Sequence, residues 1–124
     1  MHRALDNAYR ALRVYFRRGQ EVLAAIAAGD VTLVEESLRL RGAAFHNFRV
    51  QDVSATDAGF DITEMADARQ VVAQIQVQNQ KIVEAYSGFS RMVRRELAEI
   101  GRKKQQASRY RSRAKTISQF SKSV

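Results

Sequence analysis

Apolar side chains recur at steps of three and four residues along the first part of the chain, which is the spacing of one face of an α-helix. The positions on this face are Leu5, Tyr9, Leu12, Phe16, Gly19, Leu23 and Ile26. Gly29 can adopt the left-handed conformation that closes a helix, and Asp30 can accept from the free amides that open the next one. The pattern therefore predicts helices at about 3–28 and 31–54, joined as a tight antiparallel hairpin.

Turn-forming and capping residues mark the end of the second helix. This helix has a less regular pattern than the first, with an apolar stripe at Val34, Leu38, Phe45 and Phe48. The stretch 54–60 reads SATDAGF, a cluster of turn formers that predicts the second loop. Asp61 and Glu64 follow at the spacing of a capping box, which predicts that a third helix starts near residue 62.

The third helix carries the most regular pattern in the sequence. Its seam alternates steps of three and four and includes Met65, Ala68, Val72, Ile75, Asn79, Ile82, Tyr86, Phe89 and Val93, with Ile100 returning to it later. Such a seam predicts a long, coiled-coil-like helix over about 62–110. A lone Asn at a core heptad position fixes the register of the packed helices at some cost in stability. Asn79 is therefore expected to have this structural role.

Composition supports an all-α fold. The 124-residue chain is 45% hydrophobic and has six glycines but neither proline nor cysteine, so the residues that punctuate many-stranded folds are scarce. We therefore expect an antiparallel three-helix bundle or coiled coil with a long C-terminal helix, without disulfides or thiolate metal sites. The longest apolar run, 22–28, has seven residues where a membrane span needs about 20, so no transmembrane segment is expected.

The formal net charge of +8 arises at the C-terminal end. Residues 1–101 contain 13 basic and 13 acidic side chains, whereas 102–124 contain eight basic side chains and no acid. This division predicts a helical bundle domain over 1–101 and a basic, partly disordered C-terminal tail over 102–124. Such a basic amphipathic segment can bind an acidic partner or a membrane surface, or fold on binding. Apolar residues of the tail recur at helical spacing, less regularly than in the third helix, and they are Ala107, Tyr110, Ala114, Ile117 and Phe120.

Helix lengths set the third helix apart from the hairpin. Helices of about 25 residues span about 37 Å, whereas 62–110 would span about 73 Å. The hairpin can therefore cover the third helix only to about Tyr86 or Gly88, and the later apolar side chains are expected to form a partner-binding stripe. The candidate residues are Tyr86, Phe89, Met92, Val93, Leu97, Ile100 and Tyr110. Two alternatives stay open: a kink at Gly88 that folds the helix back, and pairing of two chains.

No catalytic, cofactor or metal site is expected from the sequence. His2 and His46 are its two histidines, and the helical di-iron pattern, which needs a Glu three residues before each ligand His, finds alanine at position 43. Glu35 and Glu36 are adjacent, so their side chains splay about 100° apart around a helix. A glycine-rich phosphate loop is also missing. The sequence thus predicts a binding protein rather than an enzyme.

The organisation of residues 5–110 resembles the flagellar type III export chaperones of the FlgN and FliT kind. The resemblance rests on a hairpin that reads AAIAAGDVTLVEESL and a long helix that carries QNQKIVEAYSGFSRMVRREL. Members tend to have a small-residue helix end, then Gly-Asp, then an acidic-apolar helix, which here are Ala28, Gly29, Asp30, Glu35 and Leu38. They then tend to have an Asn in the long helix, heptad-spaced apolar residues and a terminal aromatic. The matching residues here would be Asn79 for the Asn, Ile82, Phe89 and Val93 for the apolar residues, and Tyr110 for the aromatic.

The resemblance implies a cytoplasmic export chaperone that is not an enzyme. Its protein client would be a late flagellar subunit, a hook-associated or filament-cap protein, held by its amphipathic C-terminal helix and so kept from premature assembly. Export apparatus components would be further partners. The alternatives are a homo-oligomeric coiled-coil structural or adaptor protein, including a homodimer, and a weak nucleic-acid binder that uses the basic tail. The tail has only Tyr110 and Phe120 as stacking aromatics, so no specific nucleic acid is expected as a partner.

Overall fold

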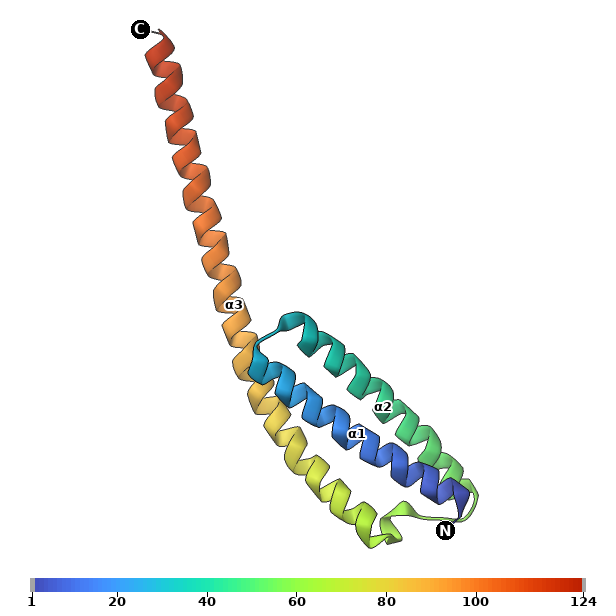
Figure 1. Cartoon of the computed structure of the whole chain (residues 1–124). Helices are drawn as coiled ribbons and strands as arrows, with labels where there is room; N and C mark the ends of the chain where they lie inside the picture. Colours follow the sequence, from blue (N-terminus) through green and yellow to red (C-terminus); the bar gives the residue numbers. More distant parts are fainter. Residues whose placement is uncertain (1, 124) are drawn as a thin grey trace. The chain divides into compact units, whose positions relative to one another are not determined.

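The computed structural model describes the backbone of residues 2–123 and the side chains of residues 2–113. Within these residues the chain is all-α, as predicted (Figure 1). Its elements are α1 (Arg3–Ala28), α2 (Val31–Asp57), the short 3-10 helix η1 (Ile62–Glu64) and α3 (Ala66–Ser123). Helices α1 and α2 pack antiparallel, and a long C-terminal helix follows them, so the expected fold class is confirmed.

The turn between α1 and α2 has the geometry that its two residues predicted. Gly29 has a φ of +68°, in the left-handed region, and its N–H donates to the Ile26 carbonyl at 3.0 Å. The Asp30 carboxylate accepts from the Leu33 N–H at 3.1 Å and so satisfies one of the free amides of α2. Both sides of the turn are therefore fixed by local hydrogen bonds.

The end of α2 lies later than predicted. The helix continues past residue 54 because Ala55 is fully buried in the core. It ends in a Schellman motif, in which Phe60 N–H donates to the Ala55 carbonyl and Gly59 N–H to the Thr56 carbonyl, both at 2.9 Å. Gly59 is the left-handed residue of this motif, with φ at +87°. The loop predicted at 54–60 is therefore wrong for its first half, which packs as helix.

The start of α3 also differs from the prediction. The Asp61 carboxylate accepts from the Thr63 hydroxyl at 2.6 Å and from the Thr63 N–H at 2.9 Å, and these hydrogen bonds lower the pKa of Asp61. Glu64 belongs to the 3-10 turn η1, and Met65 after it is extended, so α3 begins only after Met65. The predicted capping box is therefore wrong. The bend places Ile62 in the core, which accounts for the extra turn before the helix.

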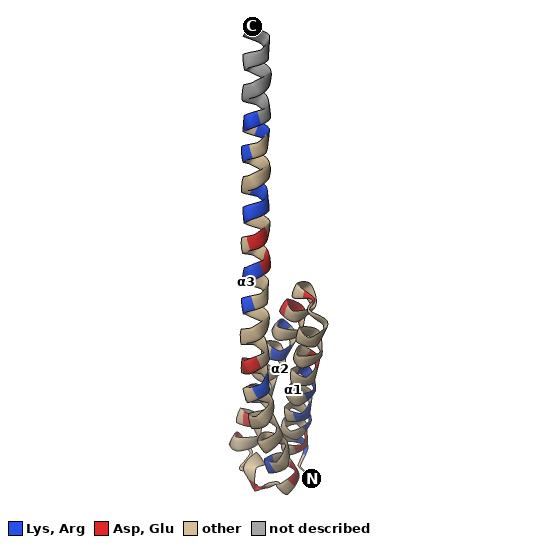
Figure 2. Ribbon diagram, turned by 90° about the vertical axis from the view of Figure 1, so that its left-hand side faces the viewer, with Lys and Arg blue, Asp and Glu red and all other residues tan. Residues whose placement is uncertain are grey.

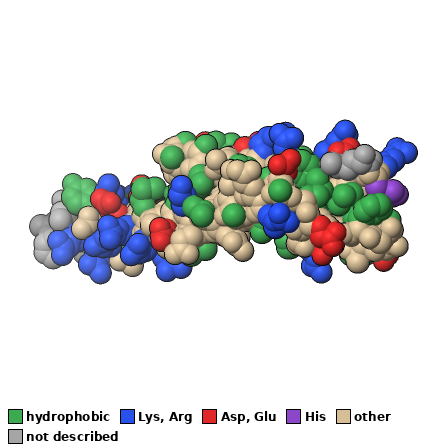
Figure 3. Space-filling view, turned by 90° about the horizontal axis from the view of Figure 1, so that it is seen from below, with side chains coloured by type: hydrophobic (Ala, Val, Ile, Leu, Met, Phe, Trp, Pro, Cys, Tyr) green, Lys and Arg blue, Asp and Glu red, His purple; other side chains and the backbone are tan. Residues whose placement is uncertain are grey.

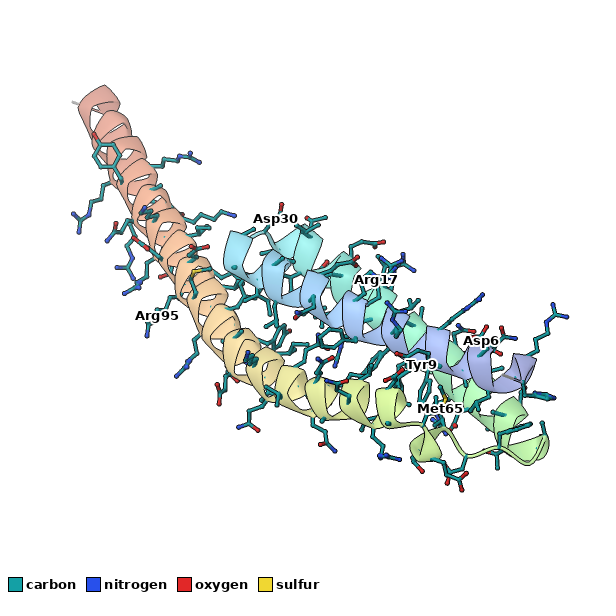
Figure 4. All side chains as sticks on the ribbon, turned by 60° about the horizontal axis from the view of Figure 1, so that its bottom comes forward. Asp6, Tyr9, Arg17, Asp30, Met65 and Arg95 are labelled. Carbon is teal, nitrogen blue, oxygen red and sulfur yellow. The ribbon has the colours of Figure 1, made fainter. Side chains whose placement is uncertain are left out.

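The core of the bundle combines residues from every element. Its central cluster consists of Ala8, Leu12, Ala55, Ile62, Ala68 and Ile75. Larger side chains pack against the margin of this cluster, among them Tyr9 of α1 and Met65 before α3 (Figure 4). Leu5 and Phe16, also on the predicted apolar face of α1, lie at the same margin. The predicted face of α1 is therefore only partly the buried one: Leu12 and Gly19 are buried and its other members are half-buried, while the remaining buried positions were not predicted and are Ala8, Ala11, Val22 and Ala25.

The core seam of α3 differs from the predicted seam at alternate positions. Ala68, Ile75 and Ile82 are buried as expected, but the position between the last two is taken by Gln78, which is only 3% exposed. Asn79 lies on the surface, so the prediction that it interrupts the apolar seam is wrong. Both choices keep steps of three and four, because 75, 78 and 82 fit that spacing as well as 75, 79 and 82 do.

Gln78 is buried because α1 makes room for its side chain. Its Nε2 donates to the Phe16 carbonyl at 2.8 Å and to the side-chain oxygen of Gln20 at 3.3 Å. Its amide fills the space beside Gly19, where a Cβ would overlap it. The missing side chain of Gly19 thus leaves room for this amide and brings a polar group of α3 within reach of the backbone of α1. The Oε1 of Gln78 is buried without a partner.

Asn79 contributes to the bundle from the surface instead. It accepts a hydrogen bond from Arg41 of α2, whose guanidinium carbon lies 4.6 Å from the centre of the Tyr15 ring. Tyr15 in turn contacts Phe45, with ring centres 5.2 Å apart. Arg41 thus links all three helices, and Phe45, predicted on the apolar stripe of α2, is half exposed.

The chain forms two compact units, Met1–Ser87 and Gly88–Val124, which are described separately below. Helix α3 shows no interruption at Gly88, where a kink was the alternative. The first unit has 10 basic and 11 acidic residues, whereas the second has 11 basic and 2 acidic residues. In Figure 2 the coloured part of the second unit carries more Lys and Arg than Asp and Glu. Packing thus divides the chain at Ser87, while the charge pattern predicts a boundary at Gly101.

The basic C-terminal segment is helical as far as its backbone is described. Residues 102–113 belong to α3 and are all exposed. The tail positions Ala114, Ile117 and Phe120 lie outside the residues whose side chains are described, so partial disorder of the tail stays a prediction. No helix in the described part of the chain is both long enough and apolar enough to cross a membrane.

Candidate helix-docking surface on α3

The seven residues predicted for partner binding divide between the two units. Tyr86 belongs to the first unit, where it is 45% exposed and engaged in an interaction of its own. The others lie on α3 in the second unit, and these are Phe89, Met92, Val93, Leu97, Ile100 and Tyr110. The structure therefore places six of the seven on one helical segment, whose surface can be described by itself.

Phe89 contradicts the expectation of an uncovered stripe. Its side chain is only 9% exposed and interacts within the chain, so it is not available to a partner. The reason lies in the register of α3, because 75, 78, 82, 85 and 89 continue the steps of the buried seam. The length argument set the end of this seam too early. On the side of α3 that carries this seam, Phe89 is the last buried apolar side chain in the described residues.

We call the exposed apolar face after Phe89 the docking stripe, and it comprises Met92, Val93, Leu97, Ile100 and Tyr110. At about 100° per residue, Val93 and Ile100 lie within about 20° of each other, with Leu97 on one flank and Met92 on the other. Leu97 is 63% exposed and Ile100 is 49% exposed, whereas Val93 is half-buried. Hydrophobic side chains of this kind reach the surface between Lys and Arg in Figure 3.

Charged side chains interrupt the docking stripe, and among them are Glu96, Lys103 and Lys104, the last of which lies four residues after Ile100 on the same face. Glu96 and Lys103 lie three residues from Val93 and Ile100 respectively, on the same face of the helix. Lys103 also lies 3.7 Å from the Glu99 carboxylate in an exposed ion pair. A partner lying along this face would meet a negative group first and a positive group one heptad later, so the stripe has a direction as well as an apolar surface.

The side chains of the docking stripe suit an α-helical partner. Val93, Leu97 and Ile100 stand at positions i, i+4 and i+7, the spacing at which two helices lay their apolar faces together. The flexible thioether of Met92 can adapt to partner side chains of different shape. In the described residues no cluster of His, Cys, Asp or Glu could hold a metal ion.

The first unit contains a groove that the sequence did not predict. It has a volume of about 430 Å³ and lies between α1 and α3, with an apolar lining from Phe16, Ala73 and Val77. The polar lining consists of Gln20, Gln70, Gln74, Gln78 and Lys81. Glutamines at steps of four along α3 were the available signal, but a sequence does not show that the space between two helices stays open.

Comparison of the chain with known protein families, with curated proteins and with solved structures finds no match. The function must therefore be argued from the surfaces of the molecule.

Proposed function

We propose that this chain is a cytoplasmic, non-enzymatic export chaperone of the FlgN and FliT kind. Its docking stripe holds the amphipathic C-terminal helix of a late flagellar subunit, a hook-associated or filament-cap protein, and so prevents premature assembly. The observation that carries the proposal is the exposure of Leu97 and Ile100 on one face of a helix. An apolar helix face without a cover is the receiving half of helix-on-helix recognition.

The binding energy in this proposal comes from apolar area that is covered on both helices. Fully burying a side chain such as Leu97 or Ile100 contributes about 1.5–3 kcal/mol, before the cost of association is subtracted. Glu96 and Lys103 select the orientation, because a client helix placed the wrong way round sets like charges together. While the client helix is covered it cannot pair with other subunits. Delivery to the export machinery requires its components as further partners.

The test replaces Leu97 and Ile100 together by aspartate and measures capture of synthetic peptides. The peptides cover the C-terminal helices of hook-associated and filament-cap subunits. We expect affinity to fall at least about 100-fold, because two charges then face the apolar side chains of the client. Melting temperature and molecular mass should not change. The matched control replaces Ala98 and Gln105 by aspartate, since both are exposed on the opposite face, and should bind the peptides as the unaltered chain does.

Other outcomes identify the alternatives. If the variant with aspartate at Leu97 and Ile100 binds the peptides as well as the control does, the docking stripe is not the client site. If light scattering shows that the unaltered chain is an oligomer and that the Leu97 and Ile100 variant is a monomer, the docking stripe serves self-association. A collapse of the melting temperature would mean that Leu97 and Ile100 are core residues. Binding of nucleic acid that follows the basic segment alone would support the weak nucleic-acid binder.

A further inference from the structure

Helix α3 carries a second, purely cationic stripe in the second unit. We call it the arginine stripe, and its residues are Arg91, Arg95, Arg102, Arg109 and Arg113. Steps of four and seven residues keep these five within about 40° of one another around the helix. The same geometry sets them on the side opposite Val93 and Ile100. The docking stripe and the arginine stripe are therefore separate surfaces of one helix.

The arginine stripe is exposed along its whole length. All five side chains are exposed, and no ion pair joins any of them to a carboxylate within residues 2–113. Arg95 extends from the helix into solvent in Figure 4. Like charges at steps of four repel one another and weaken a helix, so the row has an electrostatic cost that an anionic partner would remove.

The geometry of the row indicates the shape of that partner. Arg95, Arg102 and Arg109 are seven residues apart, which is about 10.5 Å along the axis, and the whole stripe spans about 33 Å. Ala98 and Gln105 border the row on one side and are neutral, whereas Glu99 borders it on the other side and pairs with Lys103 at 3.7 Å. A duplex curves away from a straight row, and a helix lying in its groove meets phosphates on both flanks. The five arginines form a straight line that matches a straight anionic rod, while the cations Arg94, Lys103, Lys104 and Arg111 lie off this line on other faces of the helix.

We propose that the arginine stripe docks an acidic α-helix of a partner protein, one that carries carboxylates at seven-residue spacing and lies along α3. Every cation of the row is arginine, whose planar guanidinium binds a carboxylate through two parallel hydrogen bonds. Because this surface faces away from the docking stripe, a client and the acidic helix bind at the same time. The inference stands independently of which client the docking stripe takes.

The experiment uses the full chain and a synthetic 28-residue peptide as the probe. The peptide has glutamates at the first and fifth positions of four heptads, which lines them up on one helical face. An isomeric peptide of identical composition, with the glutamates spread around the helix, is the control ligand. Binding is followed by fluorescence anisotropy at about 50 mM and about 150 mM salt, because exposed ion pairs weaken as screening increases.

Two triple variants with equal loss of charge separate the stripe from net charge. The stripe variant is R95Q/R102Q/R109Q, and the control variant is R94Q/K104Q/R111Q, whose positions are exposed but lie off the row. We expect the stripe variant to bind the aligned peptide about tenfold more weakly than the unaltered chain, and the control variant to stay within about threefold, since an exposed ion pair contributes modestly. Both variants should keep the helical circular dichroism of the unaltered chain.

Each remaining outcome overturns the proposal. Equal weakening by the two variants would mean that net charge alone attracts the peptide. Equal binding of the aligned and the isomeric peptide would mean that the seven-residue spacing is irrelevant. Absence of binding at about 50 mM salt would mean that the arginine stripe is not a binding surface for an acidic helix. A 30-base-pair duplex or a 30-nucleotide oligouridine that binds the stripe more tightly than the aligned peptide at about 150 mM salt would make nucleic acid the occupant.

Discussion

Replacing Gly19 by alanine should destabilise the first unit, although the same change stabilises an ordinary helix. In a helix interior the substitution gains about 1 kcal/mol from helix propensity. At Gly19 the new Cβ overlaps the amide of Gln78, so that side chain must move and its hydrogen bond to the Phe16 carbonyl is lost. Losing that bond in a buried setting costs about 1–3 kcal/mol. The balance is a net loss of about 1 kcal/mol, or about 4–8 °C in melting temperature.

The assay is urea and thermal denaturation, followed by circular dichroism, on a set of four variants. Gly42→Ala is the matched control, because Gly42 lies inside α2 with nothing within 4 Å of its Cβ position, and it should gain about 1 kcal/mol. Gln78→Ala removes the obstructing amide, so Gly19→Ala added to it should stabilise as Gly42→Ala does. The cycle formed by Gly19 and Gln78 should therefore show a coupling of about 2 kcal/mol.

Two results would refute this reasoning. If Gly19→Ala raised the melting temperature as much as Gly42→Ala, the Gln78 amide would have room to move aside, and the glycine would not be required by close approach. If the two changes at Gly19 and Gln78 were additive, the packing of α3 on α1 would not depend on this contact.

Two further predictions concern the turns. Gly29→Ala should destabilise by about 1–2 kcal/mol in the same denaturation assay, because its φ of +68° disfavours a side chain; an unchanged stability would mean that the turn relaxes at no cost. Asp61→Ala should lower the melting temperature at neutral pH, because the hydrogen bonds from Thr63 are lost. Since they lower the pKa of the folded carboxyl, their stabilising effect is present above the ordinary Asp pKa of about 3.9 and disappears as the pH falls through the lowered value. The gap between Asp61→Ala and the unaltered chain should therefore close on acidification, and an equal gap at about pH 7 and pH 2 contradicts the assignment.

Features that depend on a few neighbouring residues could be predicted from the sequence. Gly29 and Asp30 form the turn they indicated, because a left-handed glycine and an N-cap carboxylate act within one helical turn. Asp61 shows the limit of such reasoning. Its carboxylate could accept from the N–H of Thr63, two residues on, or of Glu64, three residues on, and burial of Ile62 in the core favoured the first, in a 3-10 turn, over the capping box. Tertiary packing decided between local alternatives that the sequence left equal.

Positions that depend on contact between helices could not be predicted. A seam read by steps of three and four does not distinguish Gln78 from Asn79, and only the space beside Gly19 places Gln78 inside. Phe89 was assigned to an open stripe because helix length alone does not tell where burial ends. The arginine stripe was present in the sequence as a row at steps of four and seven. Counting the charges of the tail as a total concealed that Arg102, Arg109 and Arg113 line up on one face with Arg91 and Arg95.

The charges within the docking stripe also bear on self-association. Glu96 and Lys103 are seven residues apart, so they hold equivalent positions in a heptad seam. In a parallel in-register pair each would face its own copy, and like charges set together in an interface cost several kcal/mol. In an antiparallel pair whose seam runs through Val93, Leu97 and Ile100, Glu96 of one chain can instead lie opposite Lys103 of the other. A parallel pairing of identical chains therefore buries these two charges badly, whereas an antiparallel copy, or a different helix with a cation opposite Glu96 and an anion opposite Lys103, does not. The charges of the docking stripe therefore disfavour a parallel in-register dimer and leave the antiparallel orientation as the one to test.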